Sequence, residues 1–146
     1  MAKSLGIDFG LKRIGIALSD ETGTIALGKE VIANDNACYK KIQAIVKESD
    51  VVTVVIGLPV KMNNEPTEQT VVTQKFITAL RLKLPAEVSV VSWDERMTSK
   101  IAGDQLLESG MKKMKRQDKS HLDKLSAAII LQDFLDASKN KERHHH

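Results

Sequence analysis

Cysteine and histidine are scarce in this sequence. Cys38 is the only cysteine, and three of the four histidines form the terminal run 144–146, which we interpret as the start of a purification tag. A single cysteine excludes an internal disulfide and a cysteine-clustered zinc site, and we expect its thiol to be buried or idle. Catalytic sites that pair histidine with serine or cysteine would all have to use His121. We therefore expect carboxylates to carry any chemistry.

Aromatic residues and long apolar runs are also scarce. With aromatics at 3%, the chain has no base-stacking platform of the kind that sequence-tolerant single-strand binders use. No segment approaches the roughly 18 consecutive apolar residues that span a bilayer, and the N-terminus enters a strand pattern at once instead of a signal-peptide pattern. We expect a cytoplasmic protein with no membrane partner.

The length and composition fit one ordinary domain. The chain has 146 residues, of which 42% are hydrophobic, enough to bury a core without disulfides or metals. We expect a single domain over residues 1–138 and a disordered tail with the tag remnant over residues 139–146. The net charge of +3 is mild, and by itself it says only that nucleic acid is not repelled.

The apolar residues are spaced as in an α/β protein. Strands are predicted where they alternate or form β-branched runs, at residues 4–9, 14–18, 24–32, 51–56 and 88–93. Helices are predicted from the caps Asn34–Asn36 to Ser49, from Glu65 to before Pro85, from Thr98 or Ser99 to Gly110, and from about Ser120 to Ala137. Short turns join the first three strands, and helical crossovers precede the last two. This order predicts a mixed five-stranded sheet, three antiparallel strands followed by two parallel ones, flanked by about four helices.

One carboxylate lies inside the first predicted strand. Asp8 alternates with apolar residues, and a carboxylate in that position costs several kcal/mol of desolvation unless it is paired or bound to a cation. Gly6 and Gly10 flank it on the same strand face, which would let a phosphate backbone or a hydrated ion come close. The alternative is that Asp8 stabilises the turn by pairing with Lys12 or Arg13. If Asp8 is instead a metal ligand, we expect Lys12 and Arg13 to bind the phosphates of the substrate.

Further acids follow the last predicted strand. Asp94 and Glu95 stand at the end of that strand, where parallel sheets place ligand sites, and either could be a metal ligand. Arg96 would hold a phosphate or steady the neighbouring acid. The alternative is a solvated turn between strand and helix.

The last predicted helix carries another candidate acid. Asp123 precedes Ala127 by one turn, so the helix face that bears the acid also bears a small side chain that permits close approach to the sheet. An exposed aspartate at a helix start, favoured by the helix dipole, would give the same pattern.

Three oxygen ligands without an imidazole suit Mg²⁺ or Mn²⁺ better than zinc. Two such ions, about 4 Å apart, would activate a water and stabilise the leaving oxygen in phosphodiester cleavage. Hydrolysis would then be in line, and no residue need act as a covalent nucleophile.

A basic segment precedes the last helix. Residues 111–119 contain one acid, Asp118, and five cations, Lys112, Lys113, Lys115, Arg116 and Lys119. Its position beside Asp123 would let this segment bind the phosphates of a nucleic acid. A solvated loop is the alternative.

Four motifs, taken in order, resemble those of the bacterial YqgF family. They are residues 6–10 (GIDFG) with 12–15 (KRIG), 57–59 (GLP), 94–98 (DERMT), and Asp123 through 127–128 (AA) to 130–132 (ILQ). The match spans nearly the whole chain. The resemblance implies an RNase H-like fold and an acidic triad of Asp8, Glu95 and Asp123 that is both catalytic and metal-binding.

The resemblance also implies two substrates, a Holliday junction and the precursor 5′ end of small-subunit ribosomal RNA. Leu11 departs from the family, which commonly has threonine there, and removes a hydroxyl near the presumed phosphate path. Asn64 replaces a usual glycine, a substitution that asparagine tolerates because it adopts left-handed conformations readily.

The sequence therefore predicts a metal-dependent nuclease that processes the 5′ end of precursor small-subunit ribosomal RNA. One alternative is a Holliday-junction resolvase acting on branched DNA, and symmetric resolution would require a homodimer. A second is a non-catalytic nucleic-acid-binding module. Sugar kinases and actin-like ATPases open with a related strand and turn, but they need two such domains and this chain has room for one.

Overall fold

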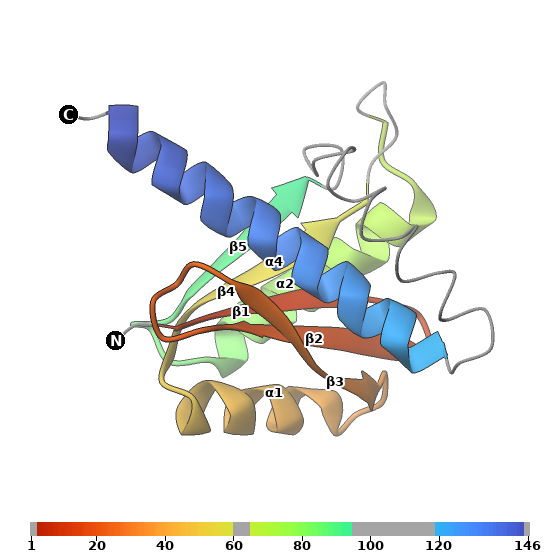
Figure 1. Cartoon of the computed structure of the whole chain (residues 1–146). Helices are drawn as coiled ribbons and strands as arrows, with labels where there is room; N and C mark the ends of the chain where they lie inside the picture. Colours follow the sequence, from red (N-terminus) through yellow and green to blue (C-terminus); the bar gives the residue numbers. More distant parts are fainter. Residues whose placement is uncertain (1–2, 60–64, 95–118, 145–146) are drawn as a thin grey trace.

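One mixed sheet organises the chain. The computed structural model describes residues 3–59, 65–94 and 119–144, and within the last helix it describes the side chains of residues 124–138. The elements are β1 (Lys3–Phe9), β2 (Arg13–Ser19), β3 (Ala26–Ala33), α1 (Cys38–Glu48), β4 (Val51–Leu58), α2 (Glu68–Lys83), β5 (Ser89–Asp94) and α4 (Lys119–His144). The strands lie in the order β3-β2-β1-β4-β5 (Figure 1).

The strand directions confirm the predicted sheet. β2 pairs antiparallel with both β1 and β3, whereas β4 pairs parallel with β1 and β5 pairs parallel with β4. Across the three parallel strands, Ile7 lies beside Ile56, and Ile56 lies beside Ser92. Phe9, Leu58 and Asp94, which end β1, β4 and β5, therefore mark one edge of the sheet, which we call the carboxyl edge.

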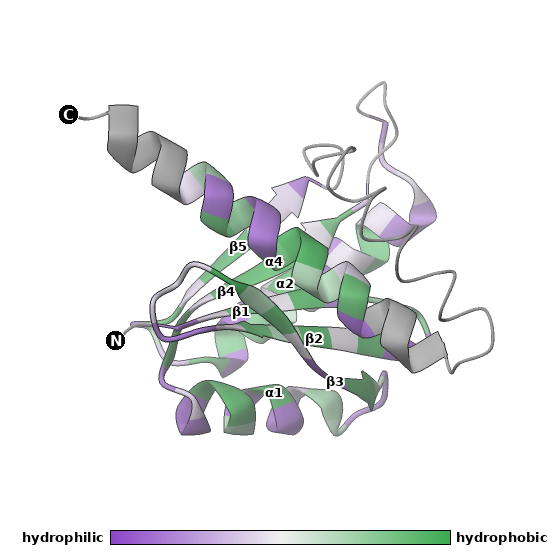
Figure 2. Cartoon of the chain, viewed as in Figure 1, coloured by the Kyte–Doolittle hydropathy of each residue, from purple (hydrophilic) through white to green (hydrophobic). Residues whose placement is uncertain are grey.

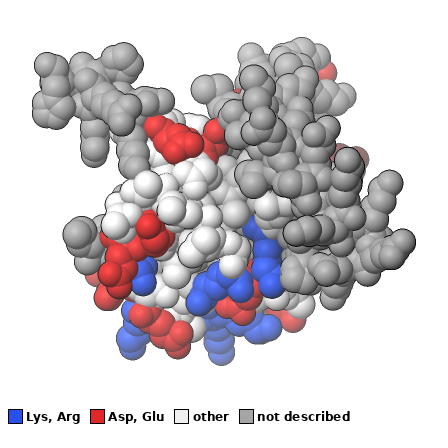
Figure 3. All heavy atoms as spheres, in the orientation of Figure 1, with Lys and Arg blue, Asp and Glu red and all other residues white. Residues whose placement is uncertain are grey.

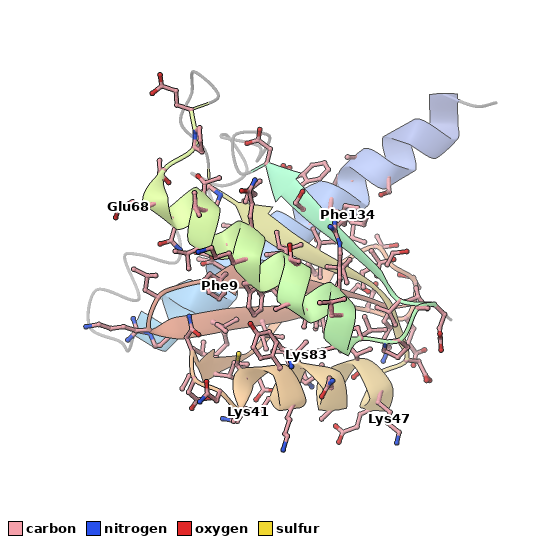
Figure 4. All side chains as sticks on the ribbon, turned by 180° about the vertical axis from the view of Figure 1, so that it is seen from behind. Phe9, Lys41, Lys47, Glu68, Lys83 and Phe134 are labelled. Atoms are coloured by element: carbon pink, nitrogen blue, oxygen red, sulfur yellow. The ribbon has the colours of Figure 1, made fainter. Side chains whose placement is uncertain are left out.

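Helices cover both faces of the sheet, as Figure 1 shows. α1 and α2 pack on one face, where their apolar residues meet Leu5, Ile7 and Phe9 of β1. Phe9 stacks on Phe76 of α2 with ring centroids 4.4 Å apart, and Figure 4 shows it on this side of the molecule. The alternation predicted for β1 is thus confirmed, because its apolar residues all point into this larger core.

α4 crosses the other face alone. Its buried residues form a smaller core with Ala17 of β2 and Val55 of β4, and Figure 2 shows hydrophobic residues along the part of α4 that crosses the sheet. We call the two sides the α1/α2 face and the α4 face. Among the described residues, no helix is long and apolar enough to cross a membrane.

The predicted cap of the first helix was wrong. The N-cap of α1 is Ala37, which makes no side-chain cap hydrogen bond. Asn34 instead donates its side-chain amide to the carbonyl of Gly10, 2.7 Å away, because the turn after β1 needs a donor there. The start of α2 follows the sequence more closely: Thr67 is its N-cap and forms a reciprocal capping box with Thr70.

Two helix predictions remain to be placed. α4 continues to His144, beyond the predicted end at about Ala137, since residues 138–143 contain neither glycine nor proline and are mostly good helix formers. The helix predicted from Thr98 or Ser99 to Gly110 lies outside the described residues.

Cys38 is buried, as expected, and burial raises the pKa of its thiol above the ordinary value.

Candidate metal centre

Asp8 lies on β1 directly opposite Gly15 of β2. Since Ile7 and Phe9 point into the α1/α2 core, strand alternation places Asp8 on the α4 face, and the residue is half-buried. Gly15 itself contributes no side chain beside the Asp8 carboxylate. The same alternation places Arg13 on the face of Asp8, two residues nearer the carboxyl edge.

Gly6 has a different role from the one its position suggested. A Cβ added to Gly6 would lie 2.6 Å from Cβ of Leu131 and 2.9 Å from the carbonyl oxygen of Ala127. The space over Gly6 is therefore taken by α4, and the expectation that this glycine leaves room for a phosphate or a hydrated ion was wrong. The close approach expected at Ala127 is confirmed.

The direction of α4 is fixed by its contacts with β3. Gln132 contacts the backbone of Thr24 and Ala26, whereas Cβ of Lys124 would lie 3.0 Å from a Cβ added to Gly28. The direction along α4 from Gln132 to Lys124 is therefore the same as the direction along β3 from its first residue, Ala26, towards Gly28. Through the antiparallel register, the same direction runs along β1 from Gly6 towards Asp8. The backbone of residue 123, one turn before Ala127 in α4, thus lies on the Asp8 side of Gly6.

Asp94, the last residue of β5, lies on the opposite face of the sheet from Asp8. Trp93, its neighbour, contacts Phe134 of α4 edge-on, with ring centroids 5.8 Å apart, and its indole N–H donates to Asp133 at 3.4 Å. Since successive strand residues point to opposite faces, Asp94 lies with Val90 on the α1/α2 face, away from Asp8. β5 does not bring Asp94 and Asp8 to one face.

Two polar residues that the sequence did not assign to the site hold the end of β1 and the turn after it. Asn34 donates its side-chain amide to the carbonyl of Gly10, and its own N–H donates to the carbonyl of Lys12 at 3.0 Å. Gln69, in the first turn of α2, donates to the carbonyl of Phe9 at 3.2 Å. The end of β1 and the turn that follows it are therefore hydrogen-bonded both to the residue after β3 and to the first turn of α2. The hairpin register could have indicated Asn34, but no sequence pattern indicates Gln69.

The turn itself presents exposed side chains beside the site. Gly10 is required there, because an added Cβ would lie 2.4 Å from the carbonyl oxygen of Arg13. Lys12 and Arg13 are exposed, and Leu11, the departure from the family pattern, is 65% exposed. Two predicted phosphate-binding cations and one apolar side chain thus flank the strand end that carries Asp8.

The remaining predicted site residues fall outside what the structure describes. These are Glu95, Arg96, Lys112, Lys113, Lys115, Arg116 and the side chain of Asp123. Within the described residues, no group of three or more histidine, cysteine, aspartate or glutamate side chains forms a metal site. The donor that is described, a carboxylate, is of the kind that Mg²⁺ and Mn²⁺ prefer.

The chain is similar in sequence over most of its length to several known proteins. The family model described as "RuvX: Holliday junction resolvase" matches residues 2–137. A protein of Flavobacterium psychrophilum named "Putative pre-16S rRNA nuclease" is 41% identical over 135 residues, which cover 92% of this chain and 97% of the relative. A protein of the same name from Sulfurihydrogenibium sp. is 39% identical over 136 residues, covering 93% of this chain and 91% of the relative.

Solved structures give the same fold. RuvC of Thermus thermophilus, solved in complex with a Holliday junction substrate, superimposes with a TM-score of 0.61 at 13% identity. The superposition covers 95% of this chain and 96% of that chain. At this identity the likeness concerns the fold alone, and it confirms the RNase H-like architecture that the motifs implied.

Proposed function

The chain belongs to the RuvX family, and on that premise we propose that it is a metal-dependent nuclease that processes the 5′ end of precursor 16S ribosomal RNA. The observation that carries the proposal is the position of Asp8. It lies on the α4 face opposite Gly15, and the backbone of residue 123 of α4 is displaced from Gly6 in the direction of Asp8. The names of the relatives support the choice of substrate.

In this proposal Asp8, Glu95 and Asp123 hold the metal. Mg²⁺ or Mn²⁺ bound there, as two ions, would supply activation of the attacking water and stabilisation of the leaving oxygen. The phosphates of the nucleic acid beside the site are bound by the predicted substrate-binding cations, Lys12, Arg13, Arg96, Lys112, Lys113, Lys115 and Arg116. The hydrogen bonds from Asn34 and Gln69 to the end of β1 keep Asp8 and the neighbouring cations in a fixed relation.

The strand geometry favours Glu95 over Asp94 as the second ligand. Because Asp94 lies on the α1/α2 face, its carboxylate is on the wrong side of β5 to share an ion with Asp8. We expect Glu95→Gln to lower the cleavage rate by more than about 100-fold, since loss of a direct ligand should exceed the loss of a residue that only supports one. We expect Asp94→Asn to cleave at nearly the parent rate.

The measurement is the single-turnover rate of both variants over a series of Mn²⁺ concentrations. The two substitutions are chemically equivalent and adjacent, so each serves as the control for the other. Equal loss in both variants, or greater loss in Asp94→Asn, would overturn the assignment of Glu95.

The choice of substrate is tested by comparing two nucleic acids under the same conditions. One preparation of the protein is incubated with Mg²⁺ or Mn²⁺ and either a precursor 16S RNA fragment with its 5′ extension or a four-way DNA junction. We expect the RNA to be cut and the junction to be left intact. Cleavage of the junction alone would instead support a resolvase, as the family description suggests. Binding of both without cleavage would support the binding-module alternative.

A further inference from the structure

α4 meets the start of β3 and the residues just before it along a line that we call the β3–α4 seam. It is defined by Thr24, Ala26 and Gly28 on one side and by Lys124 and Gln132 on the other. At its start, the Gln132 side chain accepts from the N–H of Ala26 at 2.9 Å and donates to the carbonyl of Thr24 at 2.9 Å. At the other end, Lys124 packs over Gly28. The seam is thus bridged by hydrogen bonds at the Thr24 end and closely packed at the Gly28 end.

The Thr24 end of the seam is acidic. Asp136 accepts a hydrogen bond from Gln132 at 3.1 Å, and Asp20 accepts one from the N–H of Thr24 at 2.9 Å. Backbone and hydroxyl donors around Asp20 lower the pKa of its carboxyl, so it stays ionised at neutral pH. Two carboxylates therefore lie around Thr24.

The Gly28 end of the seam is basic. Lys124 lies against Gly28, and exposed Lys29 is the extra residue that the register shift of β3 leaves between Gly28, opposite Ala17, and Glu30, opposite Ile16. The neighbouring acid, Glu30, pairs with Ile16, whose side chain is in the α1/α2 core, so Glu30 is on the other face of the sheet. Figure 3 shows basic side chains in the lower half of this view with acidic side chains among them, and further acidic side chains at its top and left.

The basic end is also the end nearer the candidate metal centre. Along β3, Gly28 lies between Ala26 and Ala33, and Ala33 pairs with Arg13, which is on the face of Asp8. A polyanion that extends from Arg13 across β2 towards β3 would therefore reach Lys124 and the exposed Lys29 before it reached Asp20 and Asp136.

We infer that Lys29 and Lys124 form a second phosphate-binding surface, over which the nucleic acid leaves the metal centre and crosses the edge of the sheet at β3. The inference rests on the proposed function, because it takes a nucleic acid as the bound polyanion. The acidic end of the seam sets the limit of this surface, since phosphates are repelled by Asp20 and Asp136.

The first test is the salt dependence of binding. The probe is a fluorescein-labelled RNA duplex with a single-stranded 5′ extension, bound in EDTA so that no cleavage occurs. For the Lys29→Gln, Lys124→Gln double variant we expect the slope of log K against log[KCl] to fall by about 1.4 to 1.8, because each phosphate contact contributes about 0.7 to 0.9.

The matched control is the Lys41→Gln, Lys47→Gln double variant. It removes the same charge from α1, where both lysines are exposed and point away from the sheet (Figure 4). We expect its slope to equal that of the parent. A slope that changes equally in both double variants would overturn the inference, whether or not the parent cleaves RNA. If the parent binds neither RNA nor branched DNA, the inference and the proposed function fall together.

A second test uses the burial of Cys38, which is 1% exposed. Lys29→Cys adds a single accessible thiol that can carry a photoactivated crosslinker, and Lys47→Cys places the same group on α1. We expect RNA crosslinks from position 29 and none from position 47. Absence of crosslinks from position 29, with thermal unfolding unchanged from the parent, would also overturn the inference.

Discussion

Asp8→Asn is expected to abolish cleavage in Mg²⁺ or Mn²⁺ while leaving the affinity for nucleic acid close to that of the parent. The substitution keeps the shape of the side chain and removes its charge, which is what binds the metal. We expect the single-turnover rate to fall by at least about 1,000-fold, equivalent to about 4 kcal/mol of transition-state stabilisation. Affinity is kept because no cation is changed.

A matched control is available at the other end of the molecule. Asp50 is exposed and has a positive φ of 53°, a conformation that asparagine adopts readily, so Asp50→Asn makes the same chemical change without strain. We expect this variant to cleave like the parent. Calorimetric titration with Mn²⁺ should show weaker binding in Asp8→Asn alone. If Asp8→Asn keeps parent activity and parent Mn²⁺ affinity, the alternative that Asp8 stabilises the turn gains.

The fold could be predicted from the sequence because its signals are local. Strand alternation in β1 separates Asp8 from Leu5, Ile7 and Phe9, and the β-branched run of β4 indicates a strand buried on both faces. The directions of the strands then follow from the lengths of the connections. Each of these signals is contained in a few consecutive residues, so each can be identified from a single sequence.

The parts that could not be predicted depend on contacts between distant segments. Asn34 has the sequence context of a helix cap, yet its amide bonds a turn 24 residues earlier in the chain. Gly6 lies beside a candidate metal ligand, yet α4 occupies the space above it. A local pattern shows that a glycine or an amide is needed, and only the packed structure shows which partner requires it.

The choice between Asp94 and Glu95 shows the same limit. Both rows of β5 contain apolar residues, Val90 on one face and Val91 with Trp93 on the other, so periodicity does not say which row faces α4. The contact between Trp93 and Phe134 decides it. Once the face of Trp93 is known, Asp94 must be on the face opposite Asp8.

Gly6→Ala is expected to reduce both stability and cleavage, although it adds only one methyl group and changes no carboxylate. The added Cβ would lie 2.6 Å from Cβ of Leu131 and 2.9 Å from the carbonyl oxygen of Ala127, and neither atom is at the end of a flexible side chain. α4 must therefore move away from β1. We expect a loss of about 1 to 3 kcal/mol in the free energy of unfolding, typical of an overpacked core, measured by thermal or urea denaturation.

The effect on catalysis should exceed the effect on folding. α4 carries Asp123, so a shift of this helix changes the spacing between Asp123 and Asp8, and a misplacement of about 1 Å can cost about 100-fold in rate. At a temperature where the variant is fully folded, we expect kcat to fall by about that factor and KM to stay near the parent value. Gly28→Ala is the control, because its added Cβ would lie 3.0 Å from the side-chain Cβ of Lys124 and requires a smaller shift of the same helix. Equal losses in the two variants, or parent activity in Gly6→Ala, would show that the packing of α4 on β1 does not set the geometry of the metal ligands.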